Sequence, residues 1–314
     1  MAINNRLKIP TVVLLISFFV LAGWLAGRSS VNKKSIPTNE FPLLSKRVLF
    51  NNPNEMIVNF SELRKTLKDY HKENGLDGSI YFEYLPTGTS IRVDGDSPRV
   101  GASLMKLPIA MLLYKTAEEG KINLDDQITL EESWLNSEYG DLYKKGAGYK
   151  LTLRQAAEIM LKESDNTALA AISMSLEGKA QDVDNPLTYL DLDYNQNEDS
   201  TVSISARSYS SFLKCLYFSC YLNKQDSQEI LGHLANSVSE NRLRSGVPSS
   251  ITLAHKIGSF GDKVQSDCGI IYLNKRQYLL CVMLNGPDNS ETSKHISELS
   301  KLTFDFVNNT KSSR

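Results

Sequence analysis

Three apolar runs follow one another within residues 251–284, ITLAHKIGSFGDKVQSDCGIIYLNKRQYLLCVML. The runs are ITLAHKIGSF, SDCGIIYL and QYLLCVML. They are rich in β-branched and aromatic residues, and polar turn residues separate them, so they predict three consecutive antiparallel strands. A closing helix is expected from about Ser290.

The N-terminal end of the same domain also carries strand signals. Residues 60–75 have apolar positions at helical spacing, and residues 78–85 and 90–95 flank the turn PTGT as a hairpin. Between the two ends lie an apolar helix from about Leu107 and an amphipathic helix over residues 152–163. We therefore predict an α/β (α+β) fold, in which both ends build one five-stranded antiparallel sheet flanked by helices, with a helical subdomain inserted.

The composition excludes several classes of partner. The chain has 314 residues, 41% of them hydrophobic and 23% charged, which is ordinary for a globular protein. Its 35 basic residues nearly balance its 36 acidic ones and form no basic stripe, so nucleic acid is not an expected partner. The four cysteines lack the spacing of a zinc site, so we expect no metal and no cofactor. We expect a monomer.

The first 28 residues differ from the rest of the chain. An uncharged run from Ile9 to Gly27 would span about 28 Å as a helix, close to the ~30 Å hydrocarbon core of a bilayer. Its length and the lack of a small-residue cleavage site favour an uncleaved anchor over a removed signal peptide, and either would export the domain. We expect a cytoplasmic stub and transmembrane anchor over 1–28, a tether over 29–55 and an extracytoplasmic domain over 56–310. If the segment is cleaved, the domain is secreted.

Two cysteines would meet if residues 268–281 form a hairpin. With a turn at Asn274 and Lys275, Cys268 would face Cys281 across the two strands. A disulfide outside the cytosol is one interpretation, and two small buried thiols are the other.

Ser103 and Lys106 lie three residues apart at the start of an apolar helix, in GASLMKLPIAMLLY. Their side chains share one helix face, and Pro108 indicates the first turn. Proline also pushes Leu107 away from helical geometry. A lysine in apolar surroundings loses its proton more readily, so Lys106 can take a proton from the Ser103 hydroxyl. The same spacing recurs elsewhere in the chain, so these two residues alone do not identify a nucleophile.

Two further elements follow in order along the chain. Ser164, Asp165 and Asn166 come just after a helix, in KESDNTA, and Lys256, Ile257 and Gly258 lie in a strand, in HKIGSFG. With Ser103 and Lys106 they resemble the Ser-x-x-Lys, Ser-Asp-Asn and Lys-Thr-Gly elements of the penicillin-recognising active-site serine hydrolases, most closely class A β-lactamases. The surrounding LTLRQAAEIMLKESDNTA, RLRSGVP and SDCGIIY are similar too, and the resemblance covers about residues 58–308.

The resemblance implies acyl transfer. Ser103 would attack the carbonyl of a β-lactam or an acyl-D-alanyl-D-alanine stem peptide, with Lys106 as proton acceptor. Ser164, held by Lys256, would relay the proton to the leaving nitrogen. The other implied substrate contacts are the Asn166 side chain, the oxyanion-hole N–H groups of Ser103 and Ser259 beside Gly258, Arg242 at the substrate carboxylate and Tyr139 at the cleft entrance. A solvated surface position is an equal alternative for Arg242.

The sequence departs from the family pattern at two places. Class A β-lactamases activate the hydrolytic water with the glutamate of a Glu-x-x-Leu-Asn loop, and here that loop is shortened, with Asp191-Leu192-Asp193-Tyr194-Asn195 as its nearest counterpart. Asp191 is either a deacylation base or a capping or solvated loop residue. Ile257 replaces a hydroxyl that binds the substrate carboxylate. A lost hydrogen bond of about 1.5–3 kcal/mol would weaken recognition roughly ten- to a hundredfold.

We therefore expect a membrane-tethered, class A β-lactamase-like serine hydrolase that forms an acyl-enzyme with β-lactams and releases it slowly. One alternative is a penicillin-inhibited DD-peptidase that acts on the D-Ala-D-Ala end of peptidoglycan stem peptides. A second is a non-catalytic cell-wall-binding module, which Ile257 favours.

Overall fold

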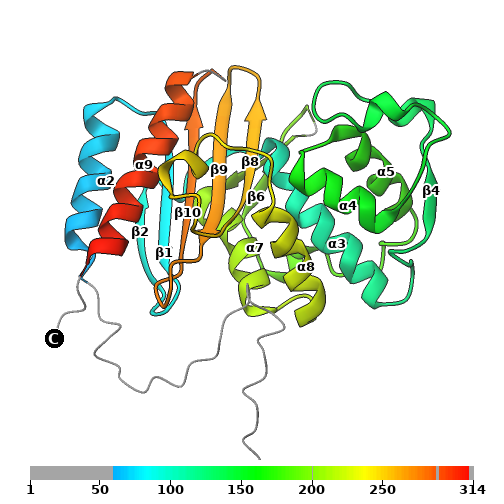
Figure 1. Cartoon of the computed structure of the whole chain (residues 1–314), viewed down its shortest axis with the longest axis horizontal. Coiled ribbons are helices and arrows are strands. Elements are labelled where there is room, and N and C mark those ends of the chain that lie inside the picture. Colours follow the sequence, from blue (N-terminus) through cyan, green and yellow to red (C-terminus); the bar gives the residue numbers. More distant parts are fainter. Residues whose placement is uncertain (1–58, 200, 288–289, 311–314) are drawn as a thin grey trace, which may run out of the picture. The chain divides into compact units, whose positions relative to one another are not determined.

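The computed structural model describes residues 59–199, 201–287 and 290–310. Its main sheet has five strands in the order β2-β1-β10-β9-β8, and every neighbouring pair is antiparallel. The strands are β1 (Gly78–Tyr84), β2 (Thr89–Val93), β8 (Leu253–Phe260), β9 (Val264–Ile271) and β10 (Tyr278–Asn285). The prediction of one antiparallel sheet built from both ends of the domain is therefore confirmed (Figure 1).

The predicted anchor and tether lie outside the described residues. Within the ranges that are described, no helix is both long and apolar enough to cross a membrane.

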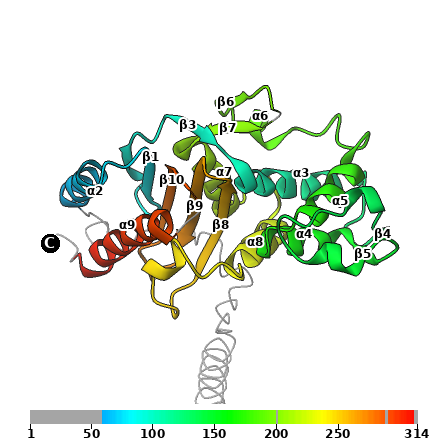
Figure 2. The ribbon, with the colours of Figure 1, turned by 90° about the horizontal axis from the view of Figure 1, so that it is seen from above.

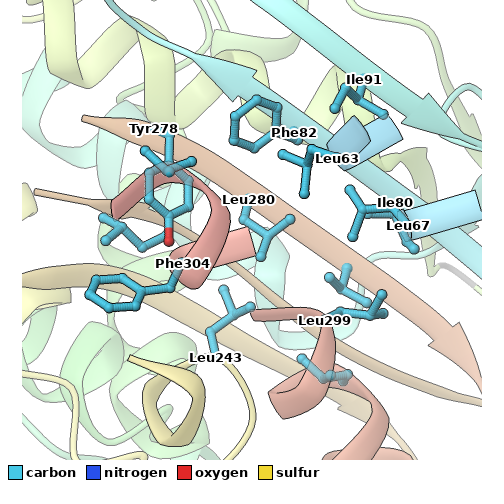
Figure 3. Packing of buried hydrophobic residues seen from close by; sticks show 14 of the residues in the cluster. Leu63, Leu67, Ile80, Phe82, Ile91, Leu243, Tyr278, Leu280, Leu299 and Phe304 are labelled. Carbon is cyan, nitrogen blue, oxygen red and sulfur yellow. The ribbon is translucent and has the colours of Figure 1, made fainter. Parts of the chain in front are cut away.

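One face of the sheet packs against the first and last helices, α2 (Ser61–Glu73) and α9 (Ser290–Asn309), which lie side by side in Figure 1. Leu63 and Leu67 of α2 and Leu299 of α9 are fully buried. They pack with side chains of β1 and β10 such as Phe82 and Leu280, as Figure 3 shows. Burial of each such side chain contributes about 1.5–3 kcal/mol to the free energy of folding, so this core stabilises the sheet against α2 and α9.

The helical subdomain lies beyond the other side of the sheet (Figure 2). It contains α3 (Lys106–Glu118), α4 (Leu153–Lys162) and α5 (Asn166–Leu176), while α7 (Ala206–Phe218) and α8 (Lys224–Ala235) pack near the sheet. Because these helices fall between β2 and β8 in the chain, the predicted insertion is confirmed.

Local sequence signals determine where α4 begins, whereas packing determines where α3 begins. Thr152 caps α4, since its hydroxyl accepts from Gln155 N and the Gln155 side chain bonds back to Thr152 N. α3 begins at Lys106, directly after the 3₁₀ turn Ala102–Met105. Leu107 is therefore helical, contrary to the expectation from Pro108. Its side chain is fully buried, and this burial outweighs the steric preference of a residue before proline.

Two small sheets were not expected from the sequence. β3 (Pro98–Val100), β7 (Val202–Ser205) and β6 (Tyr194–Gln196) form one, and β4 (Gln127–Thr129) pairs with β5 (Lys150–Thr152) in the other. A short turn joins β6 to β7, in which Asn197 N donates to Thr201 O at 2.8 Å. The remaining helix is α6 (Pro186–Tyr189), and 3₁₀ turns lie at Glu132–Trp134, Leu142–Lys145 and Arg244–Gly246.

All four cysteines are paired. Cys268 and Cys281 are partners in the β9–β10 ladder and form a disulfide. Of the two interpretations of this pair, the disulfide is confirmed. The turn falls at the predicted place, with Lys275 at φ +58°. The second disulfide links Cys215, in the last turn of α7, to Cys220 just after the helix, and it was not expected.

Candidate active site

The three sequence elements meet where the 3₁₀ turn Ala102–Met105 approaches strand β8. A Cβ atom on Gly258 would lie 3.0 Å from both Gly101 O and Leu104 Cγ, so only glycine fits there without displacing the turn. Ser103 and Ser259, whose N–H groups were expected to form the oxyanion hole, are therefore carried by two segments in contact.

Lys106 Nζ lies at the centre of the site. It donates to Ser103 Oγ at 3.2 Å, to Ser164 Oγ at 3.3 Å and to Asn166 Oδ1 at 2.6 Å. It also donates to the carbonyl of Ser164. Ser103 is half-buried, while the Lys106 side chain is buried. One amine thus joins the 3₁₀ turn to the start of α5 and lies within hydrogen-bond distance of two hydroxyl groups.

The pKa of Lys106 is lowered. Burial destabilises the charged amine and lowers its pKa to about 8, although the nearby carboxylate of Asp165 acts in the opposite direction. At pH 7 roughly a tenth of such amines are neutral, compared with fewer than about one in a thousand at the ordinary lysine pKa. A neutral amine beside Ser103 Oγ can accept its proton.

Ser164 connects this lysine to a second one. Lys256 Nζ donates to Ser164 Oγ at 2.9 Å and to Ile257 O at 3.1 Å. Burial, followed by the nearby Lys106 cation, lowers the pKa of Lys256 well below its ordinary value. Lys106, Ser164 and Lys256 thus form a continuous chain of polar groups from the helical subdomain to the sheet.

Asp165 holds the Ser-Asp-Asn segment in place. Its carboxylate accepts from Ala168 N at 2.7 Å, which caps α5, and from Leu142 N at 2.9 Å. A Cβ atom on Gly140 would lie 2.0 Å from this carboxylate, so the loop that precedes Leu142 fits closely around it. The loop also brings Tyr139 to the site, since Tyr139 O accepts from Asn166 N at 3.0 Å while its side chain is 38% exposed.

Two residues next to the reactive groups have strained backbones. Ala102 precedes Ser103 and has φ +46°, and Ser164 has φ +59°. Residues with a side chain rarely adopt this left-handed region, which costs of order 1–3 kcal/mol. The surrounding contacts hold both serines in position despite that cost.

Arg242 is not a surface residue. Its side chain is 2% exposed and donates to Gly258 O at 3.0 Å, Ser266 O at 2.8 Å, Ser259 Oγ at 2.8 Å and Gln265 Oε1 at 2.6 Å. The alternative of a solvated arginine is therefore wrong. The guanidinium lies against the strand that carries Lys256, on the side of Ser259.

Asp191 does not share the buried surroundings of Lys106 and Ser164. It is exposed, has φ +49° and lies in the turn after α6. In the small sheet, Tyr194 of β6 and Arg99 of β3 both pair with Ile204 of β7. The other end of this sheet leads to Gly101, which precedes Ser103 by two residues. Asp191 therefore comes before the Tyr194 end of β6, which is the end further from Gly101. It fits the alternative of a solvated loop residue.

One buried hydrogen-bonded pair next to Lys256 was not predicted from the sequence. His255 Nδ1 lies 2.9 Å from Asp267 Oδ1, and both side chains are buried. The signal was present, because each is an ionisable residue within an apolar strand, but their pairing depends on the β8–β9 register. In the part of the chain that the structure describes, no group of three or more histidine, cysteine or acidic side chains is arranged to hold a metal ion.

Comparisons with known proteins agree with this geometry. The model of the Beta-lactamase enzyme family matches residues 62–307. A mutant of the protein PBP-A, solved as an acyl-enzyme complex with penicillin G, is 23% identical with a TM-score of 0.72, covering 80% of this chain and 97% of that one. A β-lactamase from Sphaerobacter thermophilus DSM 20745 is 20% identical with a TM-score of 0.71, covering 80% and 98%.

A β-lactamase from Chitinophaga pinensis DSM 2588 is 21% identical with a TM-score of 0.70, covering 78% of this chain and 99% of that one. A search of curated proteins found no match. At these identities the solved structures establish the fold, and the family model covers most of the chain. The chain therefore belongs to the β-lactamase enzyme family and is a serine hydrolase of the β-lactamase type.

Proposed function

We propose that the chain forms a covalent acyl-enzyme with β-lactams through Ser103 and releases it slowly. The observation that carries the proposal is the position of Lys106 Nζ, which contacts Ser103 Oγ, Ser164 Oγ and Asn166 Oδ1 together and has a lowered pKa. The fold's similarity to a PBP-A mutant solved as an acyl-enzyme with penicillin G adds support.

In the acylation step, the Ser103 oxygen forms a bond to the β-lactam carbonyl carbon as its proton passes to the Lys106 amine. The carbonyl oxygen becomes an oxyanion, stabilised by the N–H groups of Ser103 and Ser259, and one such donor is typically worth about 3 kcal/mol. The amide C–N bond then breaks as Ser164 delivers its hydroxyl proton to the leaving nitrogen. Ser164 takes a proton in turn from the Lys106 ammonium, whose Nζ lies 3.3 Å from Ser164 Oγ, so the proton removed from Ser103 ends on the leaving nitrogen. Lys256 keeps the Ser164 hydroxyl oriented for this transfer.

The substrate is held by groups around Ser103. Asn166 binds the side-chain amide of the substrate, and Ser259, whose hydroxyl accepts from the buried Arg242 guanidinium, binds its carboxylate. Tyr139 lines the entrance, and Ile257 gives the carboxylate no hydroxyl donor. Recognition of the carboxylate is therefore weaker than the family pattern would provide.

Release of the acyl group requires a water molecule and a base. The Asp191 carboxylate is exposed in the turn after α6, and the sequence lacks the Glu-x-x-Leu-Asn pattern that would supply a base. Without a positioned base, a step that such a base would accelerate about 10²- to 10⁴-fold becomes slow. The acyl-enzyme then accumulates.

We further propose that the domain lies outside the cytoplasm and is tethered to the membrane by its N-terminal segment. The nineteen-residue uncharged run from Ile9 to Gly27 supports the tether. The two disulfides support the compartment, because structural disulfides persist in oxidising environments and are rare in the cytosol.

Intact-mass spectrometry of the purified domain with a penicillin tests the proposed chemistry. We expect the wild type to gain the mass of one penicillin and Ser103→Ala to gain none. If neither protein gains mass at any concentration, the acylation proposal is wrong and the binding-module alternative takes its place.

A DD-peptidase is the second candidate, and the missing Glu-x-x-Leu-Asn pattern favours it, since penicillin-inhibited peptidases also hold their acyl group. Release of D-alanine from an acyl-D-Ala-D-Ala peptide, without steady β-lactam turnover, would identify this activity.

A further inference from the structure

The His255–Asp267 pair lies on the face of strands β8 and β9 that is opposite to Lys256. His255 is 2% exposed and Asp267 is 0% exposed, and His255 Nδ1 contacts both carboxylate oxygens, at 2.9 Å and 3.1 Å. Alternate residues of a strand point to opposite faces, so the two sides of β8 present His255 and Lys256 in succession. The acylation steps described above leave this pair without a role.

Asp267 also holds the segment that carries Arg242. Its Oδ2 accepts from Leu243 N at 3.0 Å, and Leu243 follows Arg242 directly. The Arg242 guanidinium in turn donates to the carbonyls of Gly258 and Ser266, on the two strands that carry His255 and Asp267. One carboxylate therefore connects β8, β9 and the segment of Arg242. These contacts hold the Arg242 backbone in a strained conformation, with φ +57°.

The charges near Lys256 make Asp267 important for that lysine. Burial, and the cations of Lys106 and Arg242, all act to lower the pKa of Lys256, whereas the negative charge of Asp267 acts to raise it. On the helical side of the site, Asp165 has the same effect on Lys106. Each lysine thus has one buried carboxylate that favours its charged form.

Ile257 shields this carboxylate on its own strand face. Ile257 and Asp267 are direct partners in the β8–β9 ladder, so their side chains lie on the same face and are neighbours. An apolar neighbour keeps water away from Asp267 and leaves its interactions with nearby charges less screened. The residue that departs from the family pattern therefore lies next to the buried pair.

We propose that Asp267, oriented by His255, is a positioning residue that supplies a negative charge to the sheet side of the active site and holds the segment of Arg242 in place for acylation. The proposal rests on the proposed reaction at Ser103 for its catalytic consequence. Its electrostatic part concerns the resting protein and is tested without any substrate.

The test is an NMR titration of the lysine amines in the isotope-labelled protein between pH 5 and 10, with Lys256→Met to assign the Lys256 signal. In Asp267→Asn we expect the Lys256 midpoint to fall by about one pH unit, since one nearby opposite charge is lost. The matched control is Glu83→Gln, which removes a buried carboxylate from β1 of the same sheet that is bonded to Lys214. This control should leave the midpoint unchanged.

An unchanged Lys256 midpoint in a folded Asp267→Asn protein would overturn the proposal. If Asp267→Asn does not fold, His255 provides a second test, since asparagine retains an N–H donor near the position of Nδ1 and leucine does not. We expect acylation by penicillin to slow about tenfold in His255→Leu and less than threefold in His255→Asn. Equal rates in the two would contradict the orienting role.

A failure of the proposed function would be recognised separately. If the wild type forms no penicillin adduct, the reaction at Ser103 is wrong, and the Lys256 titration still measures whether Asp267 is the counter-charge.

Discussion

The groups that would form the acyl-enzyme and the segment that would release it differ in how firmly they are held. Lys106, Ser164 and Lys256 are buried, come from three elements and are joined by hydrogen bonds. The β6 segment carries exposed side chains, and in the turn after it Asp199 bonds to Thr201 of the same turn. Acylation needs groups fixed before the substrate arrives, and only the first region has them.

The largest expected effect comes from removing the amine at the centre of the first region. Lys106→Met should slow adduct formation with a penicillin about 10²- to 10⁴-fold, because the proton acceptor of Ser103 is lost. The rate is measured by rapid-quench intact-mass spectrometry. Lys115→Met is the matched control on the same helix, since Lys115 pairs with Glu118 on the surface, and it should stay within twofold of the wild type. A loss smaller than threefold in Lys106→Met would remove Lys106 from the mechanism.

The pH dependence of acylation tests the same group without a mutation. A base must be neutral to accept a proton, and the pKa of Lys106 is lowered to about 8. The neutral fraction, and with it the acylation rate, should rise roughly fiftyfold from pH 6 to pH 8 and level off above that. Rates are measured in buffers of constant ionic strength. A flat profile, or one that falls toward pH 8, is incompatible with Lys106 as the base.

A smaller effect is expected from a substitution at Ile257, next to Lys256 of the first region. Ile257→Thr restores a hydroxyl on the cleft strand and should increase acylation by a carboxylate-bearing β-lactam about tenfold. Ile257→Val is the matched control, because valine has nearly the shape of threonine and no hydroxyl. Second-order acylation rates are compared for the two variants. Equal rates would show that the substrate carboxylate does not bind near residue 257.

The smallest effect is expected in the second region. Asp191→Asn should change the decay of the penicillin adduct by less than about twofold, since a group remote from the ester gives no general-base catalysis. The decay is followed by intact mass after free penicillin is removed. A tenfold slower decay in this variant would mean that the β6 segment reaches the ester in solution.

The sequence was sufficient to predict the elements with strong local patterns. The strand runs of residues 251–284 and the amphipathic helix that begins after Thr152 reflect periodicity, which is a property of neighbouring residues. The same holds for the Cys268–Cys281 register, which a short hairpin turn fixes. Ser103, Lys106 and Lys256 were identified through their order along the chain, and the fold brings them together.

The features that the sequence could not predict depend on contacts between distant segments. Tyr194–Gln196 has three exposed polar residues, too few to show a strand period. Arg242 is buried because carbonyls of β8 and β9 accept its N–H groups, and no local pattern indicates such acceptors. The contact of His255 with Asp267 likewise follows from strand register, which the hydrophobic patterning of two largely buried strands leaves undetermined.

The lifetime of the acyl-enzyme tests most directly the claim that the protein acylates well and deacylates poorly. The wild type is saturated with a penicillin, free drug is removed, and the adduct mass is followed over time at 25 °C. A typical enzymatic step of about 10 s⁻¹, slowed 10²- to 10⁴-fold by the lack of a base, predicts decay at roughly 10⁻¹ to 10⁻³ s⁻¹. Decay at about 10 s⁻¹ or faster, with matching β-lactam turnover, would contradict the account and show that an efficient deacylation base exists.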